Sequence, residues 1–261
     1  MSHAAIVALT SEIARAQEIF GSLTEGDWQA ASACDGWRVQ DVVCHMASVF
    51  HSIADPSTIE GGDSPDVEAN AEVPVQARRM WTVEQVRAEY DQWSTVGLAA
   101  LAGLQEPPMH DMVIPLANLG SHPMHLLANA IVFDHYCHLR HDIGAAVPAA
   151  AALPHDDSAL AVTLAWMLAG IPQMCGDALA GCDTGLNLVV AGPAAGSWIL
   201  RPGTPWTVTS GRDPALASAT TSAHSFVSWA TKRADWRESG VTLSGPSSSG
   251  AAATLDALNV I

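Results

Sequence analysis

The chain has 261 residues, enough for one large domain or two small ones with a real core. Its 11 Lys and Arg stand against 27 Asp and Glu, a formal net charge of −16, which argues against nucleic acid and anionic membrane surfaces as partners. No apolar run approaches the ~20 residues that span a bilayer, and the N-terminus lacks the basic and apolar regions of a signal peptide. We therefore predict a cytoplasmic protein with no membrane partner, and the odd number of cysteines argues against a disulfide scaffold.

The first half of the chain is predicted to be helical. Residues 3–20 carry one apolar face, typical of an amphipathic helix. A second helix begins near Val39, and its apolar stripe turns His45 inward. Residues 54–75 are acidic and rich in Gly and Pro, so we expect a long loop there, such as a rim or lid. Thr82-Val-Glu-Gln85 has the form of a capping box and predicts the start of a third helix.

A fourth helix follows Pro123, and residues 129–143 contain several side chains able to bind a metal within an otherwise apolar run. On a helical period of ~3.6 residues, Asp134 and His138 lie one turn apart on the stripe that should be buried. An ionised carboxylate left unpaired in an apolar core costs several kcal/mol, and a divalent metal or a charged partner removes that cost. The pattern indicates a paired or metal-bound carboxylate.

His45 and the pair Asp134 and His138 together make three ligands, because helical bundles build metal sites from inward side chains of facing helices. Three protein ligands with an open fourth position is the catalytic form of a zinc site. Two alternatives stay open. A lone histidine on an apolar stripe is also typical of a core histidine bonded to a backbone carbonyl, and His138 with Asp142 is a rival ligand pair.

The pattern changes after the Ala- and Pro-rich segment 145–154, which we interpret as a linker. Beyond it, short runs of strand character alternate with helical segments. The predicted helices are 157–180, 223–232 and 251–258, and the predicted strands are 186–190, 197–201, 206–209 and 241–243. We therefore predict an α+β protein in which residues 1–150 form a four-helix bundle and residues 155–261 a smaller α+β domain.

The sequence resembles the mycothiol-dependent maleylpyruvate isomerase family, a branch of the DinB/YfiT-like metal-binding bundles. The resemblance rests on Cys34-Asp-Gly-Trp37 followed by Val39-Gln-Asp-Val-Val-Cys-His45, and on Phe133-Asp-His-Tyr-Cys-His138. Trp229-Ala-Thr-Lys-Arg233 is similar to a motif of the sterol-carrier-like domain that these enzymes append. Three residues separate His138 from Asp142, one more than the spacing typical of the family.

The resemblance implies a divalent metal, usually zinc, held by His45, Asp134 and His138. It also implies mycothiol as cofactor or co-substrate, with isomerisation of, or thiol transfer to, a small electrophile such as maleylpyruvate. A metal-dependent hydrolase with a metal-activated water, and a metal- or ligand-binding protein without turnover, are the alternatives, because one fold supports many activities. The sequence predicts no particular oligomeric state.

A small acidic substrate needs cations, which are scarce in this chain. Arg140, on the helix of the predicted site, and Arg233, in the second domain, are the candidate catalytic cations. Arg233 is also interpretable as a charge at a helix C-terminus facing the helix dipole. His135 and His141 are candidate acids or bases, because an ordinary imidazole titrates near neutrality, and solvated surface histidines are the alternative interpretation.

Overall fold

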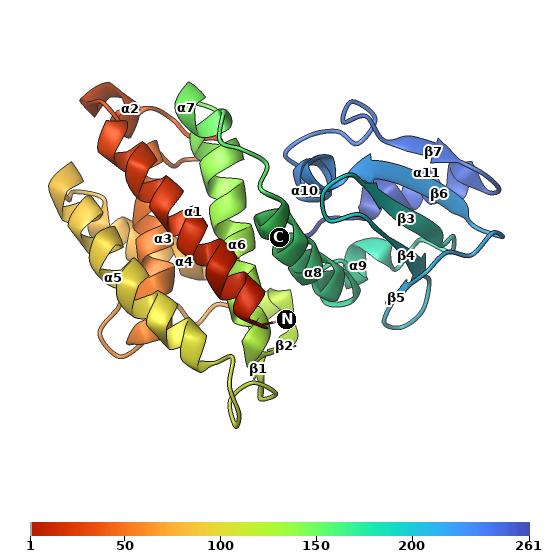
Figure 1. The fold of residues 1–261 in the computed structure, drawn as a ribbon, viewed down its shortest axis with the longest axis horizontal. Coiled ribbons are helices and arrows are strands. Elements are labelled where there is room, and N and C mark those ends of the chain that lie inside the picture. Colours follow the sequence, from red (N-terminus) through yellow and green to blue (C-terminus); the bar gives the residue numbers. More distant parts are fainter. Residues whose placement is uncertain (1) are drawn as a thin grey trace. The chain divides into compact units, whose positions relative to one another are not determined.

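The computed structural model describes residues 2–261 and divides them into two compact units, drawn in Figure 1. Unit 1 contains the residues up to Ala117 together with His122–Pro154, and unit 2 contains Asn118–Ser121 and His155–Ile261. Unit 1 is mainly helical and unit 2 contains the larger sheet. The α+β class predicted from the sequence is confirmed.

Long helices dominate unit 1, and short strands and turns connect them. Their bounds are α1 (Ser2–Ser22), α2 (Glu25–Gln29), α3 (Val39–Ala54), α4 (Val67–Arg78), α5 (Val83–Gly103), β1 (Val113–Pro115), β2 (Ser121–Pro123), α6 (Leu127–Cys137) and α7 (Pro148–Ala151). Two 3₁₀ turns, η1 (Ala117–Leu119) and η2 (Met124–Leu126), precede and follow β2 in the chain, and a π-helical turn, η3 (His138–Ile143), continues α6. Most of η1 and the first residue of β2 belong to Asn118–Ser121, which is assigned to unit 2.

Helices α3 and α5 pack closely, and their sequences explain why. The capping box predicted at the start of α5 is present, since the Thr82 side chain accepts from Gln85 and the Gln85 side chain accepts from Thr82. Phe50 of α3 is fully buried, and its ring occupies the space beside Gly97 of α5. A Cβ at Gly97 would lie 2.6 Å from that ring, so only glycine permits this approach.

The prediction of a loop over 54–75 is wrong in its second half, because α4 begins at Val67. The Asp66 carboxylate caps this helix by accepting from the Glu68 backbone N–H at 3.1 Å. Few apolar residues of α4 are buried, and polar contacts replace them. Arg78 is buried and donates to the Glu89 carboxylate of α5 at 2.7 and 2.8 Å. A buried ion pair leaves no periodic apolar signal, which is why the pattern suggested a loop.

The start of α3 depends on a buried carboxylate. Asp41 accepts from the Arg38 backbone N–H at 2.9 Å and from the Arg38 guanidinium at 2.9 and 3.0 Å. Burial alone would raise the pKa of Asp41, but the hydrogen bonds and charge of Arg38 outweigh burial and hold the pKa below its ordinary value. Asp41 therefore supplies the N-terminal cap that Arg38, at the cap position, does not supply with its own side chain.

We expect Asp41→Asn to lower the free energy of unfolding by about 1.5–3 kcal/mol at neutral pH, the range for hydrogen bonds to a charged group. The folded pKa of Asp41 lies below its unfolded value, so its contribution is present above about pH 4 and is lost as pH falls through the folded pKa. Urea unfolding of wild type and variant at neutral pH and below pH ~3 measures this, with exposed Asp63→Asn as control. An equal difference at both pH values would contradict the assignment.

Unit 2 combines a five-stranded sheet with helices. Its elements are α8 (Asp157–Met174), α9 (Gly176–Leu179), β3 (Leu186–Ala191), β4 (Gly196–Arg201), β5 (Thr207–Ser210), β6 (Ala217–Ser222), α10 (Ala223–Ala230), β7 (Thr242–Ser244) and α11 (Ser248–Ala257). The strand order is β5-β4-β3-β6-β7, in which β3 and β6 are parallel and the other neighbours antiparallel.

Strand β6 is absent from the sequence prediction because its residues are small or hydroxylated and show no apolar run. A buried side chain of the adjacent strand helps to place it. The Asn187 amide of β3 donates to the Asp213 and Leu216 carbonyls, at 2.9 and 3.2 Å, and accepts from the Asp213 backbone N–H. The turn before β6 is thereby fixed against β3. Among the described residues, no helix has the length and apolar character needed to cross a membrane.

Candidate metal centre

Three side chains of unit 1 converge on one point, namely His45 of α3, Asp134 of α6 and His138 at the start of η3. Asp134 Oδ1 lies 3.2 Å from His45 Nε2 and 3.3 Å from His138 Nε2. The two imidazole rings meet edge to face, with centroids 5.0 Å apart and planes at 78°. One donor atom from each residue lies within 4.8 Å of the other two. The structure therefore brings together the three residues that the sequence predicted as ligands.

The electrostatics of the cluster follow from a carboxylate held between imidazoles. Burial would raise the pKa of Asp134, but the charge of His138 and hydrogen bonds from neighbouring histidines outweigh burial and hold that pKa well below its ordinary value. Burial would likewise lower the pKa of His138, but Asp134 outweighs it and raises that pKa well above its ordinary value. When no metal is bound, these two shifts favour an ion pair between Asp134 and a protonated His138. A divalent ion must displace that proton to bind.

The donor set fits a zinc-class ion. Asp134 Oδ2 and His45 Nδ1 are buried and have no hydrogen-bond partner among the described residues, and His135 Nδ1 lies at the longer distance of 3.6 Å from that oxygen. An unsatisfied carboxylate oxygen in a buried place costs free energy, and a cation removes this cost by using the lone pair. Two imidazole nitrogens and one carboxylate oxygen are ligand types that zinc accepts, and three protein ligands leave a fourth position open.

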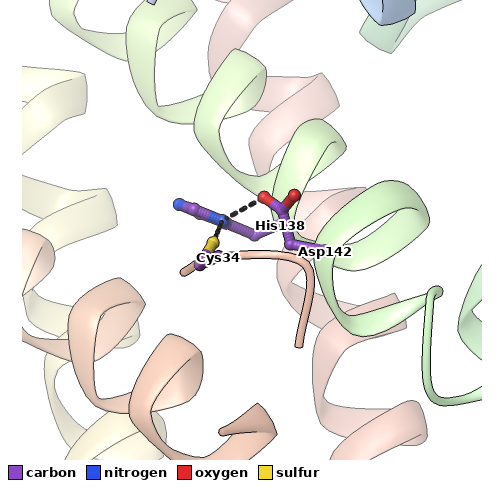
Figure 2. Close-up of side chains that lie close together, drawn as sticks. All are labelled: Cys34, His138 and Asp142. Atoms are coloured by element: carbon purple, nitrogen blue, oxygen red, sulfur yellow. Dashed lines mark hydrogen bonds and ion pairs between the residues drawn. The ribbon is translucent and has the colours of Figure 1, made fainter. Parts of the chain in front are cut away.

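Asp142 lies on the opposite side of the His138 ring. Its Oδ2 accepts from His138 Nδ1 at 2.8 Å, and Figure 2 shows the carboxylate reaching this ring nitrogen. Both residues belong to the π-helical turn η3 and are four positions apart, a spacing that places side chains on the same face of a helix. A carboxylate bound to Nδ1 fixes the tautomer and leaves Nε2 facing Asp134 and His45. In this geometry Asp142 is an outer partner of His138, and Asp134 is the carboxylate within the cluster.

We expect Asp142→Asn to weaken zinc binding by about 10–100-fold, the range for loss of an outer partner of a ligating histidine. The amide keeps the shape of the carboxylate but not its charge, so His138 loses basicity while the three donor residues stay in place. Competition with a chromophoric zinc chelator measures the dissociation constant. Asp63→Asn, an exposed change in the same unit, serves as control, and unaltered affinity in Asp142→Asn would show that the contact does not tune the site.

The loop of residues 32–37 lies beside the cluster. The Trp37 ring is 5.3 Å from the His45 ring, and Cys34 Sγ is 3.9 Å from His138 Nδ1 (Figure 2). The loop is held from two sides. Trp37 Nε1 donates to Glu72 of α4 at 2.6 Å, and the Ala33 backbone N–H donates to the Asp142 carbonyl at 3.0 Å. Cys34 and Trp37 entered the sequence prediction only as motif residues, because they lie in a loop at least eight residues before His45 and give no helical signal of this proximity.

The residues predicted as catalytic are not among the three donors of this cluster. The Arg140 guanidinium is buried, bonds the Glu12 carboxylate at 2.7 and 3.0 Å and also donates to the Pro154 carbonyl, so its charge is engaged in structure. His141 follows on η3 and is half-buried, but its donor atoms are not among those that converge on Asp134. Arg233 is exposed and follows α10 in unit 2. All three donor residues of the cluster belong to unit 1.

His135 is a core histidine. Its Nδ1 donates to the Ile131 carbonyl at 3.0 Å and its Nε2 accepts from the Tyr90 hydroxyl at 3.0 Å. The alternative considered for a histidine on an apolar stripe therefore describes His135, whereas His45 faces a carboxylate instead of a carbonyl.

The fold and the cluster define an α+β protein whose helical unit carries a candidate centre of two histidines and one aspartate. Residues 9–139 match the model of the mycothiol maleylpyruvate isomerase N-terminal domain, and the chain belongs to this family. The resemblance drawn from the sequence motifs is thus confirmed.

Solved structures extend the likeness to the whole chain. The crystal structure of the mycothiol-dependent maleylpyruvate isomerase superposes with a TM-score of 0.61 at 16% identity, covering 94% of this chain and 93% of that chain. A histidine-to-alanine mutant of the isomerase superposes with a TM-score of 0.57 at 14% identity, with the same coverage. At this identity the likeness shows the fold. A comparison with curated proteins found no match.

Proposed function

We propose that this protein is a metal-dependent isomerase that uses mycothiol to isomerise a small electrophile of the maleylpyruvate type. The observation that carries the proposal is the convergence of His45, Asp134 and His138 within the part of the chain that matches the family. Asp134 places one oxygen between two imidazoles and has a second, buried oxygen without a hydrogen-bond partner among the described residues, and a bound cation would compensate the charge of this carboxylate. We propose these three residues as the ligands of that cation.

In this proposal the metal and the thiol would supply the reactive groups, and the residues of the chain would position them. A divalent ion at this centre would supply a Lewis-acid position that favours the thiolate form of a thiol, the nucleophilic form of sulfur. Mycothiol would supply the sulfur that adds to an activated double bond and leaves again after rotation about the resulting single bond. Because the same thiol is released, the reaction needs no oxidant or reductant.

The residues of the chain supply position and charge. Asp142 holds the His138 ring so that its Nε2 faces the centre, and Asp134 contributes the negative charge that retains a divalent ion. Trp37 contacts the His45 ring and is itself held by Glu72, so the indole forms a fixed wall of the site. Such a wall restricts the volume open to water beside the centre, which strengthens the electrostatic interactions within it.

The test is turnover of maleylpyruvate by zinc-loaded protein with and without mycothiol. We expect isomerisation that requires both zinc and mycothiol and that is lost in His45→Ala. His3→Ala, a change of an exposed histidine in the same unit, is the matched control and should retain activity. Ser52→Ala, an exposed change on α3 itself, controls for disturbance of that helix.

Two other outcomes would replace the proposal. Turnover of an ester or amide without thiol, suppressed when mycothiol is added, would identify a hydrolase in which water uses the open position. Zinc bound at the centre without turnover of any electrophile in the presence of mycothiol would identify a metal-binding protein. Each outcome is read from the same zinc-loaded preparation, so loss of metal does not confuse them.

A further inference from the structure

A second group of donor side chains lies in the segment that joins α5 to α6. His110, Asp111 and His125 each offer one donor atom within 4.8 Å of the other two. His110 Nδ1 lies 2.7 Å from Asp111 Oδ1, and the two imidazole rings stack with centroids 4.2 Å apart at 16°. None of these residues belongs to the centre around Asp134. In Figure 1 the segment runs from the end of α5 past β1 and β2 into α6.

Backbone hydrogen bonds hold the two histidines face to face. The His110 carbonyl accepts from the His125 backbone N–H at 3.3 Å and from His125 Nδ1 at 2.9 Å. The Met124 backbone N–H donates to the Met112 carbonyl at 2.8 Å, and the Gln105 side chain donates to the His125 carbonyl at 3.3 Å. The arrangement is therefore built by the fold, and it is not a chance meeting of flexible surface side chains.

The hydrogen bonds also decide which nitrogen of His125 is free to bind. Because Nδ1 donates to the His110 carbonyl, the lone pair of the neutral ring is on Nε2, as in metal-ligating histidines whose other nitrogen bonds a carbonyl. Asp111 adds a carboxylate that is 89% exposed and free of packing constraints. Two imidazoles and a carboxylate are ligand types that zinc and nickel accept.

We propose that His110, Asp111 and His125 form a second site for a divalent ion of the zinc class. Parallel rings cannot both direct a nitrogen lone pair at one ion, so one ring must turn. His110 can do so, since its side chain is 34% exposed and the torsion to an imidazole ring has a broad energy profile. The bound ion joins the segment after α5 to the residues just before α6, the helix that carries Asp134.

The test is zinc stoichiometry of the full chain by equilibrium dialysis and elemental analysis. We expect about two ions per wild-type chain, and one fewer in each of His125→Asn and Asp111→Asn. The asparagine amide can keep the hydrogen bond to the His110 carbonyl while removing Nε2, and Asp111 is exposed, so at least the second variant should fold normally. His3→Ala should keep both ions.

His45→Ala separates this proposal from the proposed function. If both sites exist, His45→Ala loses one ion and the combination His45→Ala with Asp111→Asn loses both. If the centre around Asp134 holds no zinc, wild type binds one ion that Asp111→Asn removes and His45→Ala does not. Unchanged zinc content in Asp111→Asn, with wild-type thermal unfolding of the metal-free protein, would overturn the second site whatever the first one does.

Discussion

His138→Ala is expected to abolish zinc binding at the proposed centre beside Asp134, with affinity falling by more than the ~10–100-fold typical of an outer partner, because a proposed ligand itself is removed. Water must then replace an imidazole at the centre, and Asp134 loses the neighbour that most lowers its pKa. Zinc content after dialysis measures the effect directly and does not depend on knowing the substrate. Equal loss in His45→Ala and full retention in His3→Ala would establish that the effect is local.

The same centre has a predictable pH dependence. The pKa of His138 is raised, so a proton stays on its ring to a higher pH than on an ordinary histidine. Zinc competes with that proton, and its affinity should therefore fall as pH falls through neutrality.

In the substitution experiment, unchanged zinc content in both His138→Ala and His45→Ala would exclude these residues as ligands.

Glu12→Gln is expected to lower the free energy of unfolding of unit 1 by about 3–5 kcal/mol, the cost of leaving a buried charge without its partner. Glu12 and Arg140 are both buried, and the guanidinium bonds both carboxylate oxygens. Arg140→Met should cost less, because Glu12 keeps its bond to Arg15 at 2.6 Å. Urea unfolding measures both.

Two further variants make this prediction specific. Glu25→Gln, on the exposed part of α2, should leave stability unchanged. Replacing both partners, as in Glu12→Leu with Arg140→Met, should recover much of the loss, because two apolar side chains of similar volume leave no charge buried. If Arg140→Met were more damaging than Glu12→Gln, the guanidinium would have a role beyond this ion pair.

The candidate ligands could be predicted from the sequence because helical periodicity determines which side chains face inward. Each of the three lies on an apolar stripe, namely His45, Asp134 and His138, and this placement does not depend on the conformation of the loops. Arg140 could not be assigned in the same way. Its partner Glu12 lies 128 residues earlier in the chain, and only the packing of α1 against α6 brings them together.

Elements that are held in place mainly by polar contacts could also not be predicted from the hydrophobic pattern of the sequence. Helix α4 depends on Arg78 and Glu89, and strand β6 is placed beside β3 with the help of the Asn187 amide. In both cases the sequence shows polar or small residues where an element usually shows an apolar face. Trp37 belongs to this group too, because its position is set by Glu72 on a helix that the sequence did not reveal.

The π-helical turn at His138–Ile143 has a consequence for how the chain tolerates a change of length. Each residue added to an α-helix rotates everything beyond it by about 100°, so an insertion would ordinarily carry distant side chains to another face. A π-helical turn contains one more residue per turn than an α-helix, so it takes up an added residue locally and the helix before it keeps its rotation. Asp134 precedes the turn and His138 is its first residue, so both keep their angular phase on α6, whereas Asp142 lies near the end of the turn and reaches the far nitrogen of the imidazole. Deleting one residue between His138 and Asp142 would therefore leave the inner donors in place and swing only the outer carboxylate.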